Sequence, residues 1–334
     1  MDYMGKRKLL FVGVGFHSYD NLIIKELEKT CSVSYINSCS FQQRHKIMYN
    51  VLVHFNLIKI WNKLCADSIL EHISNIKETS FDVLFVIRGE YLNKDILDLL
   101  VEKYRIPKKI LYLWDSYDNH RNLEEIIGIF DFVYSFDSND CRNNGFNLRP
   151  LFYFDEKKPA VNSYDTRLFD LSFVGGDHTN RYEFISSFKQ LCIKYHLEYK
   201  FYLLIGMVSY FIYQFLPFLS RYKKSDNDIL AASSINYKDY IDILDNSKAV
   251  IDMPYSNQCG LTMRTIETLS KGIKIITTNA SISEYEDIPK ELYLVLNDET
   301  DEETIIGFLQ REINDSCLPD RYSCREALKE MLDF

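Results

Sequence analysis

Arg264 and Glu267 are the two residues whose types and spacing most directly suggest chemistry. They lie in SNQCGLTMRTIETLSKGIKIITTN at 256–279, where a polar loop leads into a helix expected over 261–271 and ended by Gly272. Residues three apart on a helix share one face. A guanidinium near a helix N-terminus can bind a diphosphate through paired hydrogen bonds, and a carboxylate one turn further can accept hydrogen bonds from ribose hydroxyls. Positive charge followed by negative charge therefore fits a nucleotide diphosphate.

The same two residues have a plainer interpretation as an ion pair on a solvated helix face, extended by Lys271. Such a pair would stabilise the helix by only about 0.3 to 0.5 kcal/mol. The surroundings favour a ligand site, because a polar loop precedes the helix and TTNAS follows the next strand at the same edge of the expected sheet. The other binding residues expected at this edge are Gln258, Gly260, Leu261, Thr262 near the helix cap, and Asn279.

A second loop with binding character follows the apolar stretch FDLSFV and reads GGDHTNR. Gly175 and Gly176 carry no side chain, so a ligand can approach the backbone closely there. Arg181 lies in the first turn of the helix that follows, where free N–H groups favour an anion. A glycine pair alone often marks only a turn. Together, however, Arg181 and Arg264 can bracket one phosphate group.

Two carboxylates in the first half of the chain are candidate general bases. Glu90 in IRGEYL and Asp115 in YLWDSYDNH each follow an expected strand, which places them at the rim of a ligand cleft. A carboxylate in that position can deprotonate an acceptor hydroxyl. The alternative is structural, with Asp115 or Asp118 capping a helix and Glu90 simply solvated.

The loop GVGFHS at 13–18 supplies a third candidate base, His17. The loop has two glycines of the dinucleotide-binding fingerprint, but Ser18 stands at the third glycine position and no acidic residue lies about 20 positions further on. A nicotinamide dinucleotide site is therefore disfavoured. The loop can instead shape an acceptor pocket with His17 as base, or His17 can be an exposed loop residue without a role.

The elements that must position these residues alternate between strands and helices. This alternation predicts an α/β protein with parallel sheets and right-handed crossovers, in two successive Rossmann-like series joined by LRPLFYFDEKKPAVNSYD. We expect an acceptor domain over 1–155, a donor domain over 165–300, and C-terminal helices over 301–334 that pack back across the domains. The two sheets are expected to face a cleft, with ligands beyond the carboxyl ends of the strands.

The composition limits the class of protein. The chain has 334 residues, 46% hydrophobic and 26% charged, as expected for a globular protein of two domains without structural metals or disulfides. Its net charge of -9 argues against a nucleic-acid partner. Serine-hydrolase, zinc-protease and P-loop motifs are absent from the sequence. The eight cysteines form no C-x-x-C pair and the N-terminal residues read directly into a strand, so a cytoplasmic protein with reduced thiols is expected.

The segment 201–220 contains no charged residue and is followed by RYKK. Glycine, glutamine and proline interrupt it, which disfavours a membrane span. We expect a strand followed by an aromatic amphipathic helix, with peripheral membrane contact through 207–224. The cations expected to meet anionic headgroups are Arg221, Lys223 and Lys224. A buried helix or an interdomain contact is the alternative.

Several stretches together resemble bacterial glycosyltransferases of the GT-B fold, of the lipopolysaccharide and capsule biosynthesis type related to spore-maturation glycosyltransferases. They are GLTMRTIETLSKGIKIITTN, DLSFVGGDHTNRYEFI, YLWDSYDN and FDFVYSFDSNDC. The resemblance implies two Rossmann-like domains, a nucleotide-sugar donor held mainly by the second, and no obligatory metal or cofactor. By this resemblance Glu267 matches the glutamate at the donor ribose and Arg264 the arginine near the diphosphate.

One departure from the family pattern concerns stereochemistry. Many retaining GT-B enzymes carry a second glutamate eight positions before the first, and Cys259 stands there in this chain. The resemblance therefore implies an inverting glycosyltransferase that uses a base of the first domain. It would transfer a sugar from a nucleotide diphosphate or monophosphate donor to a hydroxyl of a surface glycan. This acceptor is expected to be lipid-linked and to lie at the inner face of the cytoplasmic membrane. The alternative is a non-catalytic nucleotide- or sugar-binding assembly protein with the same fold.

Overall fold

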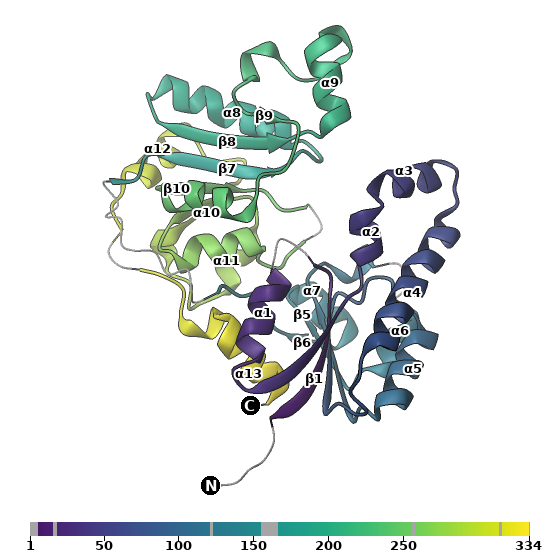
Figure 1. Cartoon of the computed structure of the whole chain (residues 1–334). Coiled ribbons are helices and arrows are strands. Elements are labelled where there is room, and N and C mark those ends of the chain that lie inside the picture. The colour runs from purple at the N-terminus through teal and green to yellow at the C-terminus, as the bar shows by residue number, and fades with distance from the viewer. Residues whose placement is uncertain are drawn as a thin grey trace. The chain divides into compact units, whose positions relative to one another are not determined.

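A computed structural model of the chain describes residues 6–15, 19–120, 123–154, 166–255, 258–313 and 316–333. The chain forms two compact units, which are Met1–Phe154 with Cys324–Phe334 (unit 1) and Asp155–Ser323 (unit 2). Both are α/β units (Figure 1). The C-terminal segment expected over 301–334 divides between them, because its first helix belongs to unit 2 and its last to unit 1.

Unit 1 is built on a parallel sheet of six strands in the order β2-β1-β3-β4-β5-β6. All five residues of the central strand, VLFVI, are buried, as expected for a parallel strand covered on both faces. The strand order reverses between β1 and β3, so a ligand is expected beyond the carboxyl ends of these two strands. The strands are β1 Arg7–Gly13, β2 Cys31–Asn37, β3 Val83–Ile87, β4 Lys108–Leu113, β5 Phe132–Ser135 and β6 Asn147–Leu148.

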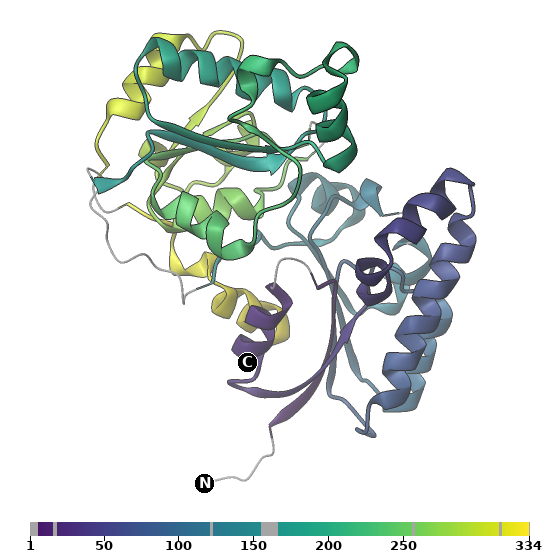
Figure 2. The same cartoon turned by 45° about the horizontal axis from the view of Figure 1, so that its top comes forward.

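Helices cover both faces of this sheet, with α1 and α13 on one face and α4 and α5 on the other (Figures 1 and 2). The C-terminal α13 is joined to the unit by a hydrogen bond of 2.7 Å from the Cys324 amide to the Tyr153 carbonyl. The sequence pattern predicts a single helical stretch over 42–77, but the structure has three helices between 40 and 75. The breaks are at His45 and over 55–57, where Asn56 is in the left-handed region (φ 57°). The helices are α1 Tyr19–Leu27, α2 Ser40–Arg44, α3 Lys46–His54, α4 Ile58–Asn75, α5 Lys94–Tyr104, α6 Leu123–Ile126, α7 Ser138–Asn144 and α13 Cys324–Leu332.

Unit 2 has a parallel sheet in the order β12-β11-β10-β7-β8-β9. Numbered from its own first strand this is 6-5-4-1-2-3, the Rossmann order, and the switch point lies between β7 and β10. The predicted α/β class with two parallel sheets is thus confirmed. The strands are β7 Leu171–Gly176, β8 Tyr199–Leu204, β9 Leu230–Ala231, β10 Ala249–Asp252, β11 Lys274–Thr277 and β12 Tyr293–Val295.

The helices of unit 2 lie on both faces of its sheet, α8 and α12 on one and α10 and α11 on the other (Figures 1 and 2). The helix expected over 261–271 spans 263–270, because Thr262 caps it by accepting a hydrogen bond of 3.2 Å from the Thr265 amide. Gly272 follows it in the left-handed conformation (φ 58°), as expected for a helix end. The helices are α8 Arg181–Lys194, α9 Met207–Phe215, α10 Tyr237–Asp245, α11 Met263–Ser270 and α12 Glu302–Gln310.

The uncharged segment 201–220 forms the end of β8 followed by α9, which confirms the predicted strand and helix. Among the described residues, no helix combines the length and the apolar character that crossing a bilayer requires. A buried helix is also excluded, because Tyr213 is the one residue of α9 that is buried, whereas Val208 is 76% exposed and Phe215 69% exposed.

Candidate functional site

The loops after β7 and β10 meet at the switch point of unit 2, and Arg264 contacts both strands. Its Nη1 donates to the Asp252 carboxylate at the end of β10 over 2.9 Å, and its Nη2 donates to the Val174 carbonyl of β7 over 2.8 Å. The guanidinium also lies 5.1 Å from the centre of the Phe173 ring. Its side chain is 18% exposed, so it is held in one place while part of it stays accessible.

Asp252 organises the polar residues beneath Arg264. It is fully buried and accepts hydrogen bonds from the hydroxyls of Thr262 at 3.3 Å, Thr265 at 3.0 Å and Thr277 at 3.4 Å. A buried carboxylate is tolerated only when it is paired and hydrogen-bonded, and Asp252 meets both conditions. The Arg264 guanidinium is therefore fixed by a rigid network that spans β10, α11 and β11.

Arg181, at the start of α8, is the second arginine of the site. Its Nη1 donates to the Gly176 carbonyl over 2.6 Å, its Nη2 donates to the Met253 carbonyl, and its guanidinium carbon lies 5.6 Å from the centre of the Phe173 ring. Burial, and then the charge of Arg264, lower the pKa of Arg181 to about 10. Two cations on one phenylalanine repel each other, and an anion bound there would relieve that repulsion.

These arginines keep donors for a ligand. A guanidinium has five N–H donors, and the contacts described above use two in each arginine. The Nε of Arg181 is buried and has no hydrogen-bond partner in the described part of the chain. The structure thus brings Arg181 and Arg264 together around Phe173, at the edge where an anion is expected.

His178 borders the arginines but adds no positive charge. Its ring stacks on Tyr255 with centroids 3.9 Å apart and the planes 15° from parallel. Burial, followed by the charges of Arg181 and Arg264, lowers the pKa of His178 to about 4. The ring is therefore neutral at pH 7.

Glu267 does not lie on a solvated face, so the plainer interpretation of a surface ion pair is wrong. It is 4% exposed, and one carboxylate oxygen accepts a hydrogen bond of 2.8 Å from the Tyr237 hydroxyl of α10. Tyr240 of the same helix also hydrogen-bonds to it, and burial together with Glu267 raises the pKa of both tyrosines. Lys271 instead forms an ion pair with Asp245.

The remaining residues expected to bind the donor surround the start of α11. The Asn279 side chain donates to the carbonyls of Cys259 at 3.3 Å and Gly260 at 3.1 Å, which fixes the loop before the helix. Leu261 is buried at 1% exposed and forms part of the core under the loop. The Gln258 amide donates to the Tyr255 carbonyl over 3.0 Å. Asn279 and Leu261 therefore position the loop.

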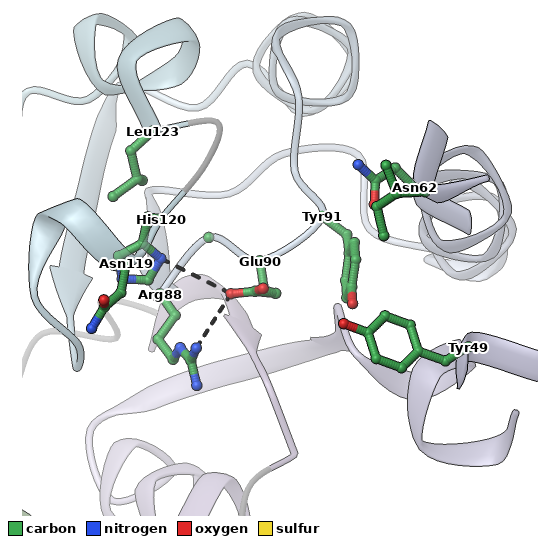
Figure 3. A pocket seen from close by; sticks show the side chains of 10 residues that line it. Tyr49, Asn62, Arg88, Glu90, Tyr91, Asn119, His120 and Leu123 are labelled. Carbon is green, nitrogen blue, oxygen red and sulfur yellow. Dashed lines mark hydrogen bonds and ion pairs between the residues drawn. The ribbon is translucent and has the colours of Figure 1, made fainter. Parts of the chain in front are cut away.

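Unit 1 contains a cavity of about 200 Å³ beyond the carboxyl end of β3 (Figure 3). The loop that forms its floor has an uncommon backbone, because Arg88, Gly89 and Tyr91 all have positive φ values, of 65°, 71° and 61°. For residues other than glycine this conformation costs about 1 to 2 kcal/mol, and clusters of such residues occur at functional sites. The cavity is lined by Tyr49, Ile58, Asn62, Arg88, Gly89, Glu90, Tyr91, Asn119, His120 and Leu123.

Two of the three expected bases, Glu90 and Asp115, meet around Arg88 at this cavity. Arg88 Nη2 lies 3.4 Å from Glu90 Oε2 and 3.8 Å from Asp115 Oδ2. Glu90 is 34% exposed at its side chain and faces the cavity (Figure 3). Asp115 also stabilises its own turn, accepting hydrogen bonds of 3.0 Å from the Ser116 amide and 2.7 Å from Asn119. His17, the third expected base, lies outside the described residues.

His120 joins this group and is the residue that sequence reasoning missed. Its Nδ1 lies 4.0 Å from Glu90 Oε2, and its side chain is 5% exposed. Its Nε2 is buried and has no hydrogen-bond partner among the described residues, so Nδ1 is the ring nitrogen that faces Glu90. Burial, and next the Arg88 charge, lower the pKa of His120, which keeps the ring neutral.

Other functional residues escaped the sequence analysis for different reasons. Asp252 and Arg88 each come at the carboxyl end of an apolar stretch, KAVI and VLFVI, and that position could have identified them. His120 and Tyr237 carry no such local signal, because their partners are distant in sequence. In the described ranges, no group of three or more His, Cys, Asp and Glu side chains is arranged to hold a metal ion.

The fold is similar to that of several solved structures, two of which contain UDP. The chain matches no protein-family model and no curated protein sequence. An α-glucosyltransferase in complex with UDP and a 13-mer DNA aligns over 98% of this chain and 95% of its own, with 12% identity and a TM-score of 0.56. HepE of Anabaena in complex with UDP and glucose aligns over 97% and 95%, with 10% identity and a TM-score of 0.53. A protein described as a UDP-N-acetylglucosamine 2-epimerase from Listeria monocytogenes aligns over 98% and 95%, with 12% identity and a TM-score of 0.52. The chain has the GT-B fold, which confirms the expected fold class.

Proposed function

We propose that this protein is a glycosyltransferase that transfers a sugar from a nucleotide-sugar donor to an acceptor hydroxyl. The observation that carries the proposal is the pair of arginines, Arg181 and Arg264, that contact the Phe173 ring at the switch point of the Rossmann-ordered sheet. UDP is present in the α-glucosyltransferase and HepE structures, whose fold is similar. A uridine diphosphate sugar is therefore the first donor to test.

In this proposal unit 2 binds the donor. The diphosphate accepts hydrogen bonds from the remaining N–H donors of Arg181 and Arg264, near the backbone of Gly175 and Gly176 and the N-terminus of α11. Glu267 accepts hydrogen bonds from the ribose hydroxyls beside those of Tyr237 and Tyr240, since a carboxylate can accept about four hydrogen bonds. The arginines stabilise the charge that develops on the leaving diphosphate, an effect that often dominates catalysis of this kind.

Unit 1 supplies the acceptor pocket and the base. His120, with Glu90 beside its Nδ1, takes the proton of the acceptor hydroxyl, and Glu90, Asp115 and His17 are the alternative bases. The acceptor oxygen then bonds to the anomeric carbon while the bond from that carbon to the diphosphate breaks, and the electron pair leaves with the nucleotide diphosphate. Configuration at that carbon is inverted. Cys259 at the position of the second glutamate supports this route.

The proposed acceptor is a lipid-linked surface glycan of the lipopolysaccharide or capsule type, used at the inner face of the bacterial cytoplasmic membrane. Peripheral contact through 207–224 is part of this proposal. Phe218 is 79% exposed, Met207 is 71% exposed, and the cations Arg221, Lys223 and Lys224 follow directly. Neither a metal ion nor a cofactor takes part in the proposed reaction.

The test is nucleotide binding followed by turnover. Calorimetry with UDP, GDP, CDP and TDP should show one preferred nucleotide, and that nucleotide should raise the melting temperature. Purified protein should then release it from the matching sugar nucleotide in the presence of acceptor glycan. Glu267→Ala should weaken binding, while Glu183→Ala, which replaces a glutamate in the first turn of α8, should not. Binding without turnover would indicate the non-catalytic alternative, and an epimerised sugar nucleotide would overturn the transferase assignment.

A further inference from the structure

The helical hairpin formed by α3 and the start of α4 in unit 1 exposes an apolar surface. None of the nine residues of α3 is buried, although the helix is mostly apolar. This α3–α4 surface continues through the connection 55–57 into the first turn of α4. Its exposed apolar side chains, with their exposed fractions, are Ile47 82%, Val51 49%, Val53 44%, Phe55 66%, Leu57 41% and Ile60 50%.

The hairpin is a fixed element of unit 1. On the inward side of α4, Trp61 is fully buried and its ring lies 5.4 Å from that of Phe41 and 5.2 Å from that of Tyr49. The Trp61 Nε1 donates a hydrogen bond of 3.2 Å to the Tyr91 hydroxyl. The exposed apolar residues are thus presented by a packed scaffold.

The same surface is purely basic, although the whole chain has a net charge of -9. No aspartate or glutamate occurs between Lys29 and Ala66, so α3, the connection 55–57 and the first two turns of α4 carry no carboxylate, and Asp67 is the first one along α4. The exposed cations are Lys46, Lys59 and Lys63 of the hairpin and Arg44 at the end of α2. Apolar side chains among cations, without any anion, match the interface of a bilayer that contains anionic lipids.

We propose that the α3–α4 surface binds the headgroup region of an anionic lipid bilayer. Apolar side chains such as Ile47 and Phe55 insert at the boundary of headgroups and acyl chains, and Lys46 and Lys59 contact lipid phosphates. A second copy of this chain is a poorer occupant, because two copies of a basic, carboxylate-free surface repel each other.

The position of this surface has a consequence for the cavity that contains Glu90. Tyr49 of α3 and Asn62 of α4 line that cavity (Figure 3). A bilayer bound at the α3–α4 surface therefore lies next to the wall of the proposed acceptor pocket, so an acceptor anchored in the bilayer can present its hydroxyl there. This consequence rests on the proposed glycosyl transfer, whereas binding of the surface to lipid does not.

The test is co-sedimentation of the full chain with vesicles of phosphatidylcholine alone or mixed equally with phosphatidylglycerol. The parent chain for this test carries Phe211→Ser/Phe218→Ser, so that membrane binding by the segment 207–224 does not hide a loss of binding by the α3–α4 surface. Ile47→Ser/Phe55→Ser should weaken binding to the mixed vesicles more than tenfold. Lys46→Glu/Lys59→Glu should weaken it by at least fivefold for each cation removed. The matched control is Leu148→Ser/Ile193→Ser, which replaces two apolar residues exposed by 45% and 52% elsewhere and should leave binding unchanged.

A depth measurement completes the test. Tryptophan fluorescence of Phe55→Trp should shift to the blue and be quenched by brominated lipids when mixed vesicles are added, whereas Ile193→Trp should show neither change. The proposal is overturned if the parent chain does not bind the mixed vesicles, or if the hairpin variants bind as the control does. It is equally overturned if the chain is a dimer in solution that Ile47→Ser/Phe55→Ser converts to a monomer, since the surface would then join two copies. Because these measurements use no sugar donor, their outcome is independent of whether transfer occurs.

Discussion

Gly175 and Arg264 lie so close together that a side chain at position 175 would meet the guanidinium. A Cβ atom at Gly175 would lie 2.9 Å from Arg264 Nη2 and 2.8 Å from Cζ of Phe173. Both neighbours are side-chain ends and can shift, so a methyl group here would displace the guanidinium with little disturbance of the backbone. Gly307 of α12, in the same unit, has open space around it, with nothing within 4 Å of an added Cβ.

This difference makes the two glycines a matched pair for testing the anion site. We expect Gly175→Ala to lower the affinity for UDP by at least tenfold, because Arg264 loses its position between Val174 and Asp252. Gly307→Ala should leave the affinity within twofold of the parent. Titration calorimetry measures both, and equal affinities in the two variants would show that the place of Arg264 is unimportant for the nucleotide.

Arg264 has a structural role and a proposed binding role, and two substitutions separate them. Arg264→Ala should lower UDP affinity about 10- to 100-fold through the loss of charge-assisted hydrogen bonds. It should also lower the free energy of unfolding by about 3 to 5 kcal/mol, because Asp252 is left buried without its cation. Adding Asp252→Asn should recover much of the stability but none of the affinity. Urea unfolding measures the free energy of unfolding of each variant, and calorimetry on the same samples measures its affinity for UDP. Recovered affinity in the double variant would assign Arg264 a structural role alone.

The sequence predicts the fold well because strands of parallel sheets are marked by local composition. The stretches VLFVI and AVI are buried on both faces and are apolar throughout. The shortest strands lack this mark. β6 and β9 have two residues each, and nothing in two residues distinguishes a strand from a loop. The break of the long helical stretch at Asn56 also has no strong sequence signal, since neither proline nor glycine stands there.

The candidate site is predictable only where its residues follow strands. Arg264 and Glu90 could be selected because the carboxyl ends of parallel strands gather at one edge. Their partners could not, since the contact of Arg264 with Val174 joins residues 90 positions apart, and that of Glu267 with Tyr237 joins residues 30 apart. Such pairs are set by the packing of whole elements.

The pKa of His178 reports on the charge of the anion site. Burial and the neighbouring arginines lower this pKa to about 4. A bound diphosphate offsets the charges of Arg181 and Arg264, so we expect saturating UDP to raise the pKa of His178. Proton NMR of the imidazole signals over a pH series gives the value with and without nucleotide. Arg264→Ala should raise it even without nucleotide, and a pKa that UDP leaves unchanged would place the nucleotide away from the arginines.

The acid side of the pH profile tests His120 as the base. Burial and the Arg88 charge lower the pKa of His120 below the ordinary value of about 6.5. The ring is therefore still neutral and able to accept a proton at pH 6.5, and activity is lost only at lower pH. Because Glu90 raises this pKa and Arg88 lowers it, Glu90→Gln should move the acid limb of kcat/KM to lower pH, and Arg88→Gln should move it to higher pH. His120→Gln should reduce kcat about 10²- to 10⁴-fold and remove this limb. If instead the limb persists in His120→Gln and disappears in Glu90→Gln, the carboxylate itself is the base.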